Sequence, residues 1–98
     1  MSLPIHFRPK AEQDLAEASA WYEEQQPGLG GRFLTQVSAA LERVADNPEM
    51  YALVEEDIRA CGLHRFPYLL YYRVLGERIE VLAVLHGSRD PSAWQERA

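Results

Sequence analysis

The spacing of apolar residues changes along the chain, and each period predicts a different element. Residues 3–7 alternate between apolar and other residues, as in a half-buried strand, and Pro4 indicates that the start or edge of this strand is unpaired. From Pro9 the spacing becomes three or four, which predicts a helix over roughly 9–25. The stripe on this helix consists of Ala11, Leu15, Ala18 and Tyr22.

A second helix is predicted after residues 27–31, a proline- and glycine-rich cluster that we expect to form a turn. Apolar spacing resumes at Phe33 and continues to Val44, and Asn47-Pro48 ends the helix. Two helices joined by so few residues should pack antiparallel as a hairpin. Such a hairpin needs a further apolar surface to cover.

Three strands are predicted in the second half, near 58–65, at 68–75 and at 78–86, after an irregular link over 50–57. Gly76-Glu77 is a two-residue loop with glycine first, which indicates a type II′ turn. One predicted face of the strand 68–75 consists of Leu70, Tyr72 and Val74, and its opposite face consists of Leu69, Tyr71 and Arg73. One predicted face of the strand 78–86 consists of Ile79, Val81, Ala83 and Leu85, and its opposite face contains Leu82 and Val84. Because both faces of the last strand are apolar, we expect it to be central. Asp90-Pro91-Ser92 then predicts a final helical turn containing Trp94.

These elements predict a single α+β domain over residues 1–98, in the order β-α-α-β-β-β. A helical hairpin should pack on one face of one antiparallel sheet, with the other face partly open. The lone cysteine, Cys61, cannot form an internal disulfide and fits a reducing cytoplasm. No apolar stretch is long enough to span a bilayer, so no membrane contact is predicted.

The net charge of −5 is unevenly distributed. Residues 1–57 carry four Lys/Arg against eleven Asp/Glu, whereas residues 58–98 carry six against four. Holding DNA requires a basic surface, so we expect no direct DNA binding by this chain alone, and any contact with an acidic partner should involve the second half. His6, His64 and His86 lack the spacing of a metal site, so neither a metal nor a cofactor is predicted.

Short motifs occur in a fixed order along essentially the whole chain. They are Trp21-Tyr22-Glu23, Gly28-Leu29-Gly30 with Phe33, Asn47-Pro48 before Tyr51, Arg59, Arg65-Phe66-Pro67-Tyr68 with Tyr71-Tyr72, Val81-Leu82-Ala83-Val84 with His86, and Arg89-Asp90-Pro91. Each motif alone is weak, but the ordered set resembles the ParE/RelE toxin superfamily, and in particular its ParE-like branch of plasmid-stabilisation proteins. The predicted order of elements is also the layout of that family.

The resemblance implies the toxin component of a type II toxin–antitoxin system, neutralised in a heteromer by a cognate antitoxin whose tail wraps along the helices and sheet. In the ParE-like branch the implied activity is inhibition of DNA gyrase by binding, without catalytic residues. In the RelE-like branch it is ribosome-dependent cleavage of mRNA by an endoribonuclease. A third hypothesis is a non-toxic subunit that binds the antitoxin or joins a repressor complex. The fold alone does not choose among them.

The residue chemistry favours the binding toxin. RNA cleavage through the 2′-hydroxyl needs a group that takes the proton and cations that stabilise the phosphate. Aligned with the RelE-like branch, Leu69 stands where that branch places a strand arginine, and Ala60 and Gly62 stand where it places lysines.

If the chain is nevertheless a nuclease, the candidate catalytic residues are Arg73, His86 and Arg89. A structural interpretation competes with this one. Strand arginines often pair with acids, here Glu55, Glu56 or Asp57, and His86 can hydrogen-bond at the sheet edge. The candidate contacts with the antitoxin or the target are Arg59, Arg65 and Arg89.

Overall fold

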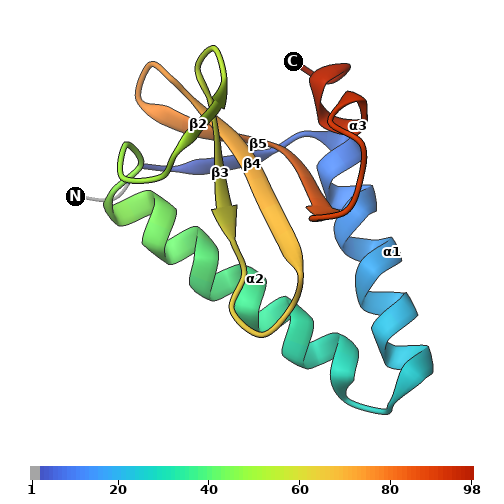
Figure 1. Ribbon diagram of the computed structural model, residues 1–98. Helices are drawn as coiled ribbons and strands as arrows, with labels where there is room; N and C mark the ends of the chain where they lie inside the picture. The colour runs from blue at the N-terminus through green and yellow to red at the C-terminus, as the bar shows by residue number, and fades with distance from the viewer. Residues whose placement is uncertain (1–2) are drawn as a thin grey trace.

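The computed structural model describes residues 3–98, so the first two residues of the predicted domain range lie outside the described part. Its elements are β1 (Ile5–Phe7), α1 (Pro9–Gln25), α2 (Leu29–Asp46), β2 (Leu53–Glu55), β3 (Ile58–Gly62), β4 (Tyr68–Leu75), β5 (Arg78–His86) and α3 (Ser92–Gln95) (Figure 1). The α+β class is confirmed, as are the bounds of the first helix and of the last two strands. The terminal helical turn is also confirmed.

Three predicted boundaries need correction. The turn between the helices is shorter than the cluster 27–31, because α2 already begins at Leu29. The strand expected near 58–65 ends at Gly62. The link over 50–57 contains the short strand β2, whose three residues are all exposed and therefore give no apolar alternation to detect.

The five strands form one sheet in the order β1-β5-β4-β3-β2. As expected, β5 is central and β1 lies at an edge. The expectation of a wholly antiparallel sheet is wrong for β1, which runs parallel to β5. The long connection between these two strands contains both helices, so no tight turn forces them to be antiparallel.

The β4–β5 turn agrees with the predicted type. Gly76 has a φ of 59°, whereas Glu77 is not among the residues with positive φ. A type II′ turn requires this combination, because only its first central residue has a positive φ. The turn therefore fixes the pairing that starts with Leu75 opposite Arg78.

The hairpin of α1 and α2 packs on one face of the sheet (Figure 1). Buried residues of the core on this face are Ala11, Ala18, Phe33, Val37, Ala40, Val44, Ala45, Cys61, Leu63, Leu70, Tyr72, Ile79, Val81 and Val84. Most of them fall at the helical and strand periods from which the elements were predicted. The hydrophobic stripe on each helix is therefore matched by one face of β4 and β5.

A bulge in β5 reverses the alternation of its last residues. Tyr71 pairs with Ala83, and the next residue of β4, Tyr72, pairs with Val81. Leu82 lies between these two partners and has no partner of its own. Beyond it, Val84 joins the helix-facing core, while Ala83 and Leu85 lie on the opposite face. The predicted faces are therefore wrong for these three residues, because one inserted residue shifts a period of two by one position.

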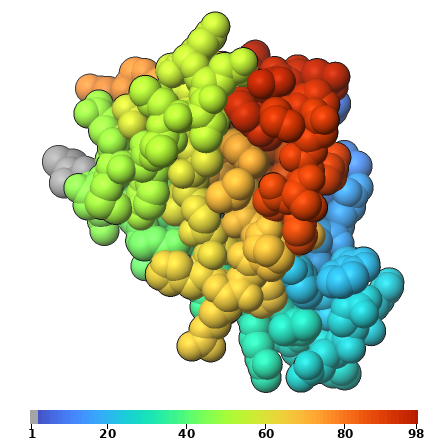
Figure 2. Space-filling model, viewed as in Figure 1, coloured from blue at the N-terminus to red at the C-terminus, as the bar shows by residue number. Residues whose placement is uncertain are grey.

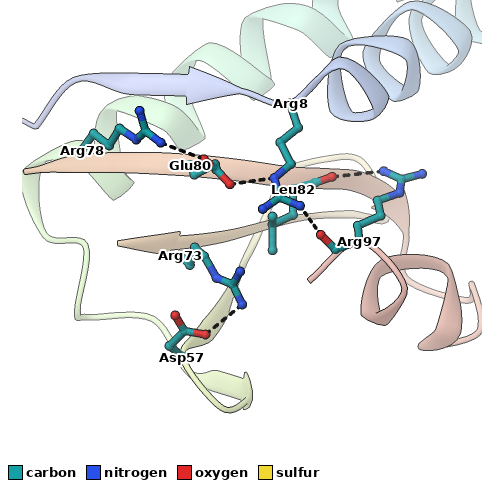
Figure 3. Close-up of polar contacts among 7 residues, drawn as sticks. All are labelled: Arg8, Asp57, Arg73, Arg78, Glu80, Leu82 and Arg97. Carbon is teal, nitrogen blue, oxygen red and sulfur yellow. Dashed lines mark hydrogen bonds and ion pairs between the residues drawn. The ribbon is translucent and has the colours of Figure 1, made fainter. Parts of the chain in front are cut away.

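Two side chains from outside the sheet satisfy backbone groups next to the bulge. Asp14 on α1 accepts a hydrogen bond from the Val84 N–H at 2.9 Å. Arg97 donates to the Leu82 carbonyl at 3.2 Å, as Figure 3 shows. The two side chains also pair with each other, with Arg97 Nη1 2.6 Å from Asp14 Oδ2. The Asp14 side chain is 8% exposed and the Arg97 side chain is 15% exposed. This Asp14–Arg97 clamp joins α1, β5 and the C-terminal segment.

The opposite face of the sheet carries a second buried cluster, made of Ile58, Tyr71, Leu82, Ala83, Leu85 and Trp94. Trp94 on α3 stacks on Tyr71, with ring centroids 5.0 Å apart and planes inclined by 17°. Figure 2 views this face, where the red C-terminal segment lies against the orange atoms of β4. The helical turn at the C-terminus thus covers part of the face that the sequence predicted to be partly open.

The turn between α1 and α2 depends on Glu23 and Gly30. The Glu23 carboxylate accepts hydrogen bonds from the backbone N–H groups of Gly28 at 2.9 Å and Gly30 at 3.0 Å, and so caps α2. A Cβ on Gly30 would lie 2.5 Å from the Ser19 carbonyl oxygen of α1. A Cβ on Gly31 would meet nothing within 4 Å. Gly30 is therefore needed for helix packing, and Gly31 is not.

Alanine substitutions at these two glycines should change stability in opposite directions. We expect Gly30→Ala to lower the free energy of unfolding by about 2 kcal/mol, since the added methyl group meets backbone. Gly31→Ala should raise it by up to about 1 kcal/mol, because it improves helix propensity in open space. Urea denaturation of both variants checks this, and equal effects at the two positions would contradict it.

Removal of the clamp carboxylate should cost more than removal of a neighbouring exposed one. Asp14→Ala leaves the Arg97 guanidinium without its carboxylate and the Val84 N–H without its acceptor, so we expect a loss of about 3 kcal/mol of unfolding free energy. Glu17→Ala, at an exposed position on the same helix, is the matched control and should lie within about 0.5 kcal/mol of the unaltered protein. Equal stability of the two variants in urea would refute the role of the clamp.

Candidate partner-binding site

The structure distributes the candidate site residues over separate regions. Arg73 lies within β4 and Arg59 within β3. His86 ends β5, and Arg89 follows it in the turn before α3. Arg65 lies in the loop between β3 and β4, not in the strand where the sequence prediction placed it. Each location constrains what the side chain can do.

Arg73 is engaged by an acid of its own chain. Its Nη2 lies 3.0 Å from Asp57 Oδ1, and its side chain is 14% exposed. Figure 3 shows the guanidinium turned toward Asp57, apart from the neighbouring ion pairs that Glu80 forms with Arg8 and Arg78. The structural interpretation, in which Arg73 pairs with a nearby acid, is therefore confirmed.

Arg59 stabilises the segment that follows α2. Its Nη1 donates hydrogen bonds to the carbonyl oxygens of Glu49 at 3.1 Å and Tyr51 at 2.7 Å. The guanidinium also lies near Tyr72, whose pKa burial raises to about 12 although the positive charge of Arg59 opposes the shift. Arg59 thus uses part of its hydrogen-bonding capacity within the fold.

His86 and Arg89 share a hollow of about 220 Å³, which we call the His86 hollow. Its lining is Asp14, Glu17, Ala18, Trp21, Tyr68, Val84, Leu85, His86 and Arg89. Tyr68 meets the His86 ring edge-on, with centroids 5.4 Å apart. Burial raises the pKa of Tyr68, and the nearby Arg89 opposes that shift. The Arg89 side chain forms no hydrogen bond or ion pair with a residue of the described range 3–98.

The hydrogen bonding of His86 fixes its tautomer. The backbone N–H of Ser88 lies 3.0 Å from His86 Nδ1, and a backbone amide can only donate. Nδ1 is therefore the acceptor, and Nε2 carries the proton when the ring is neutral. In this tautomer neither nitrogen is free to take a proton from a substrate.

Arg73 and His86 lie far apart along the β4–β5 ladder. His86 pairs with Tyr68, whereas Arg73 pairs with Glu80. Five residues of extended strand separate Tyr68 from Arg73, which corresponds to roughly 17 Å. The structure therefore brings His86 and Arg89 together and leaves Arg73 in another region.

Arg65 borders a larger hollow of about 490 Å³ at the tip of the helical hairpin, which we call the tip hollow. Its lining is Tyr22, Leu29, Arg32, Thr35, Gln36, Arg65, Phe66 and Pro67. Tyr22 meets Phe66 edge-on with ring centroids 4.9 Å apart, and burial raises the pKa of Tyr22. The gold β3–β4 loop projects beside the blue-green hairpin at the lower edge of Figure 2.

Two features of these hollows were missed by the sequence interpretation. Arg32 and Arg65 both line the tip hollow, although the two are far apart in sequence. Trp21, which neighbours the His86 hollow, is 55% exposed. An exposed tryptophan indicates a binding surface, but its exposure is known only once the helix is placed on the sheet. The helical period alone puts Trp21 next to the buried stripe and does not show that it is exposed.

Residues 3–98 contain no group of three or more His, Cys, Asp or Glu arranged to hold a metal ion. Within the same range, none of the helices is both long and apolar enough to cross a membrane. Cys61 is a free thiol buried in the helix-facing core.

Comparison with known proteins gives a consistent family. Residues 5–91 match the family model for the ParE toxin of the parDE type II toxin–antitoxin system. Toxin ParE2 of Mycobacterium tuberculosis, from strains CDC 1551/Oshkosh and H37Rv, is 34% identical over 94 residues, covering 95% of this chain and 90% of the relative. A chain from the chromosomal ParDE TA system of P. aeruginosa superposes with a TM-score of 0.76 at 18% identity, covering 87% of this chain and 96% of that one. This last match supports the fold.

The tautomer of His86 can be tested directly. In long-range ¹H–¹⁵N spectra recorded at a pH where the ring is neutral, we expect the shifts of a protonated Nε2 and an unprotonated Nδ1. Ser88→Ala retains the backbone N–H and should give the same pattern, which makes it the control. A predominantly Nδ1-protonated ring would contradict the hydrogen bond.

Proposed function

The chain belongs to the ParE toxin family of type II toxin–antitoxin systems, and on this premise we propose that it inhibits DNA gyrase by binding it. A cognate antitoxin neutralises the toxin in a heteromeric complex. In this proposal the toxin carries no catalytic residue. Its effect comes from the surface that it presents to the target.

The main support is the apolar character of the sheet face opposite the helical hairpin. Gly62 pairs with Leu69, and Ala60 pairs with Tyr71, so the three positions at which the mRNA-cleaving branch places cations are neighbours here. Leu69 and Ala60 pack against the buried cluster that contains Trp94. These positions hold no charge that could stabilise a phosphate in the transition state of cleavage.

The remaining candidates for a nuclease do not compensate for this loss. Arg73 is paired with Asp57 and lies roughly 17 Å along the ladder from the strand position of His86. His86 accepts a hydrogen bond at Nδ1, which is the nitrogen that a neutral Nε2–H ring would use as a base. The geometry therefore supports binding over cleavage.

We assign the target contact to Trp21 and Arg89 at the His86 hollow. Tryptophan and arginine are the residue types most enriched among energetically dominant interface residues. Trp21 is largely exposed, and the Arg89 guanidinium forms no ion pair with a residue of the described range 3–98. Both are therefore available to a partner protein.

The proposal predicts inhibition of gyrase without cleavage of mRNA. Purified toxin should block supercoiling of relaxed plasmid by gyrase and should leave mRNA intact on programmed ribosomes. Trp21→Ala and Arg89→Gln should each weaken inhibition about tenfold, as expected for the loss of an interface hot spot. Lys10→Gln, which removes an exposed charge elsewhere on α1, should have no effect.

Two outcomes would overturn this function. Unaffected supercoiling together with cuts at the ribosomal A site would identify a nuclease. Normal growth after induction of the toxin without its antitoxin, with folding checked by circular dichroism, would identify a non-toxic subunit.

A further inference from the structure

The tip hollow contains two cations that the fold does not neutralise. Neither the Arg32 nor the Arg65 side chain forms a hydrogen bond or ion pair with any residue from 3 to 98. Glu23, which follows Tyr22 on α1, already accepts hydrogen bonds from the backbone amides of Gly28 and Gly30. A carboxylate from outside the chain is therefore the natural partner for these guanidinium groups, since arginine binds carboxylates with charge-assisted hydrogen bonds.

The walls between the two arginines are mainly apolar. Tyr22 and Phe66 contact each other edge-on, Leu29 and Pro67 add further apolar surface, and the uncharged Thr35 and Gln36 complete the lining. The Tyr22 hydroxyl is uncharged near neutral pH and burial raises its pKa further, so this wall adds no negative charge. A volume of about 490 Å³ lies in the range of pockets that enclose a ligand or several side chains.

The backbone of Arg65 is held in a conformation that this residue type rarely adopts. Its φ is 70°, which lies in the left-handed region that favours glycine. Hydrogen bonds on either side of it, from the Leu63 N–H to the Tyr68 carbonyl and from the Gly87 N–H to the Pro67 carbonyl, fix the loop. The rest of the fold therefore maintains a strained position that presents a guanidinium to the hollow.

We propose that the tip hollow binds an acidic segment of the antitoxin. An apolar side chain of that segment packs in the hollow against the joined rings of Tyr22 and Phe66, and flanking carboxylates pair with Arg32 and Arg65. Charge complementarity and the apolar walls carry this assignment, and it rests on the proposed function because the antitoxin is taken as the occupant. Nucleic acid fits less well, because two arginines on a chain of net charge −5 are not the basic surface that phosphate binding requires.

The affinity of the full-length toxin for its purified full-length antitoxin tests the charge contacts. By isothermal titration calorimetry, Arg32→Gln and Arg65→Asn should each raise Kd about tenfold, and the double variant about a hundredfold. Asparagine is chosen at position 65 because it tolerates a left-handed backbone. Lys10→Gln is the control for loss of one positive charge and should bind within about twofold of the unaltered toxin.

A photo-crosslinking amino acid in place of Thr35, an exposed residue that lines the hollow, tests the identity of the occupant. Mass spectrometry should locate the crosslink in an antitoxin segment where carboxylates flank an apolar residue. A crosslink to a basic or uncharged segment overturns the proposal. Displacement of the antitoxin by a single-stranded oligonucleotide from the unaltered toxin, but not from the double variant, would assign the hollow to nucleic acid and also overturns it.

The design separates failure of this inference from failure of the proposed function. If the arginine variants bind the antitoxin as tightly as the unaltered toxin, the tip hollow is not the contact, although the toxin still has its partner. If they lose gyrase inhibition and keep antitoxin affinity, the hollow faces the target and the inference is wrong. If the unaltered toxin neither binds the antitoxin nor arrests growth, both proposals fail.

Discussion

The Asp14–Arg97 clamp is the interaction on which both faces of the sheet depend. A carboxylate that is 8% exposed is costly unless it is paired and hydrogen-bonded, and this one meets both an arginine and a backbone N–H. The same contacts supply partners to backbone groups beside the β5 bulge. Since Arg97 lies near the chain end, the clamp also holds the segment that places Trp94 on Tyr71. The helical hairpin and the C-terminal cover are thus tied to one point of β5.

The two proposed binding surfaces lie next to each other on α1. Trp21 lines the His86 hollow and Tyr22 lines the tip hollow, because successive residues of a helix point about 100° apart. Their rings are in edge-on contact, with centroids 5.1 Å apart. An antitoxin segment in the tip hollow would therefore lie beside the surface assigned to the target, so that neutralisation needs only a short extension of the bound chain to cover it.

Periodicity predicted the elements well because it reports burial on one face, and it failed where a single contact determines the geometry. Asp14 lies beside the predicted stripe of α1, and a pattern of apolar residues cannot predict that a carboxylate is buried. The bulge at Leu82 is invisible to alternation, since the residues on both sides of it are apolar. The left-handed backbone of Arg65 lies in a loop held by hydrogen bonds from Leu63 to Tyr68 and from Gly87 to Pro67, which no apolar pattern reports, so the predicted end of β3 was too late.

Part of the arrangement of the candidate site could be predicted from the sequence. Once the Gly76-Glu77 turn is predicted, pairing Leu75 with Arg78 already places Arg73 opposite Glu80, which separates it from His86 by several residues of strand. What the sequence could not supply is the division of arginines between internal and external roles. Arg59, Arg73 and Arg97 bind carbonyl or carboxylate oxygens of their own chain. Arg32, Arg65 and Arg89 do not pair with any residue in the described range, and these three lie in the two hollows. The arginines left unpaired by folding therefore mark where a partner protein can contribute the missing charge.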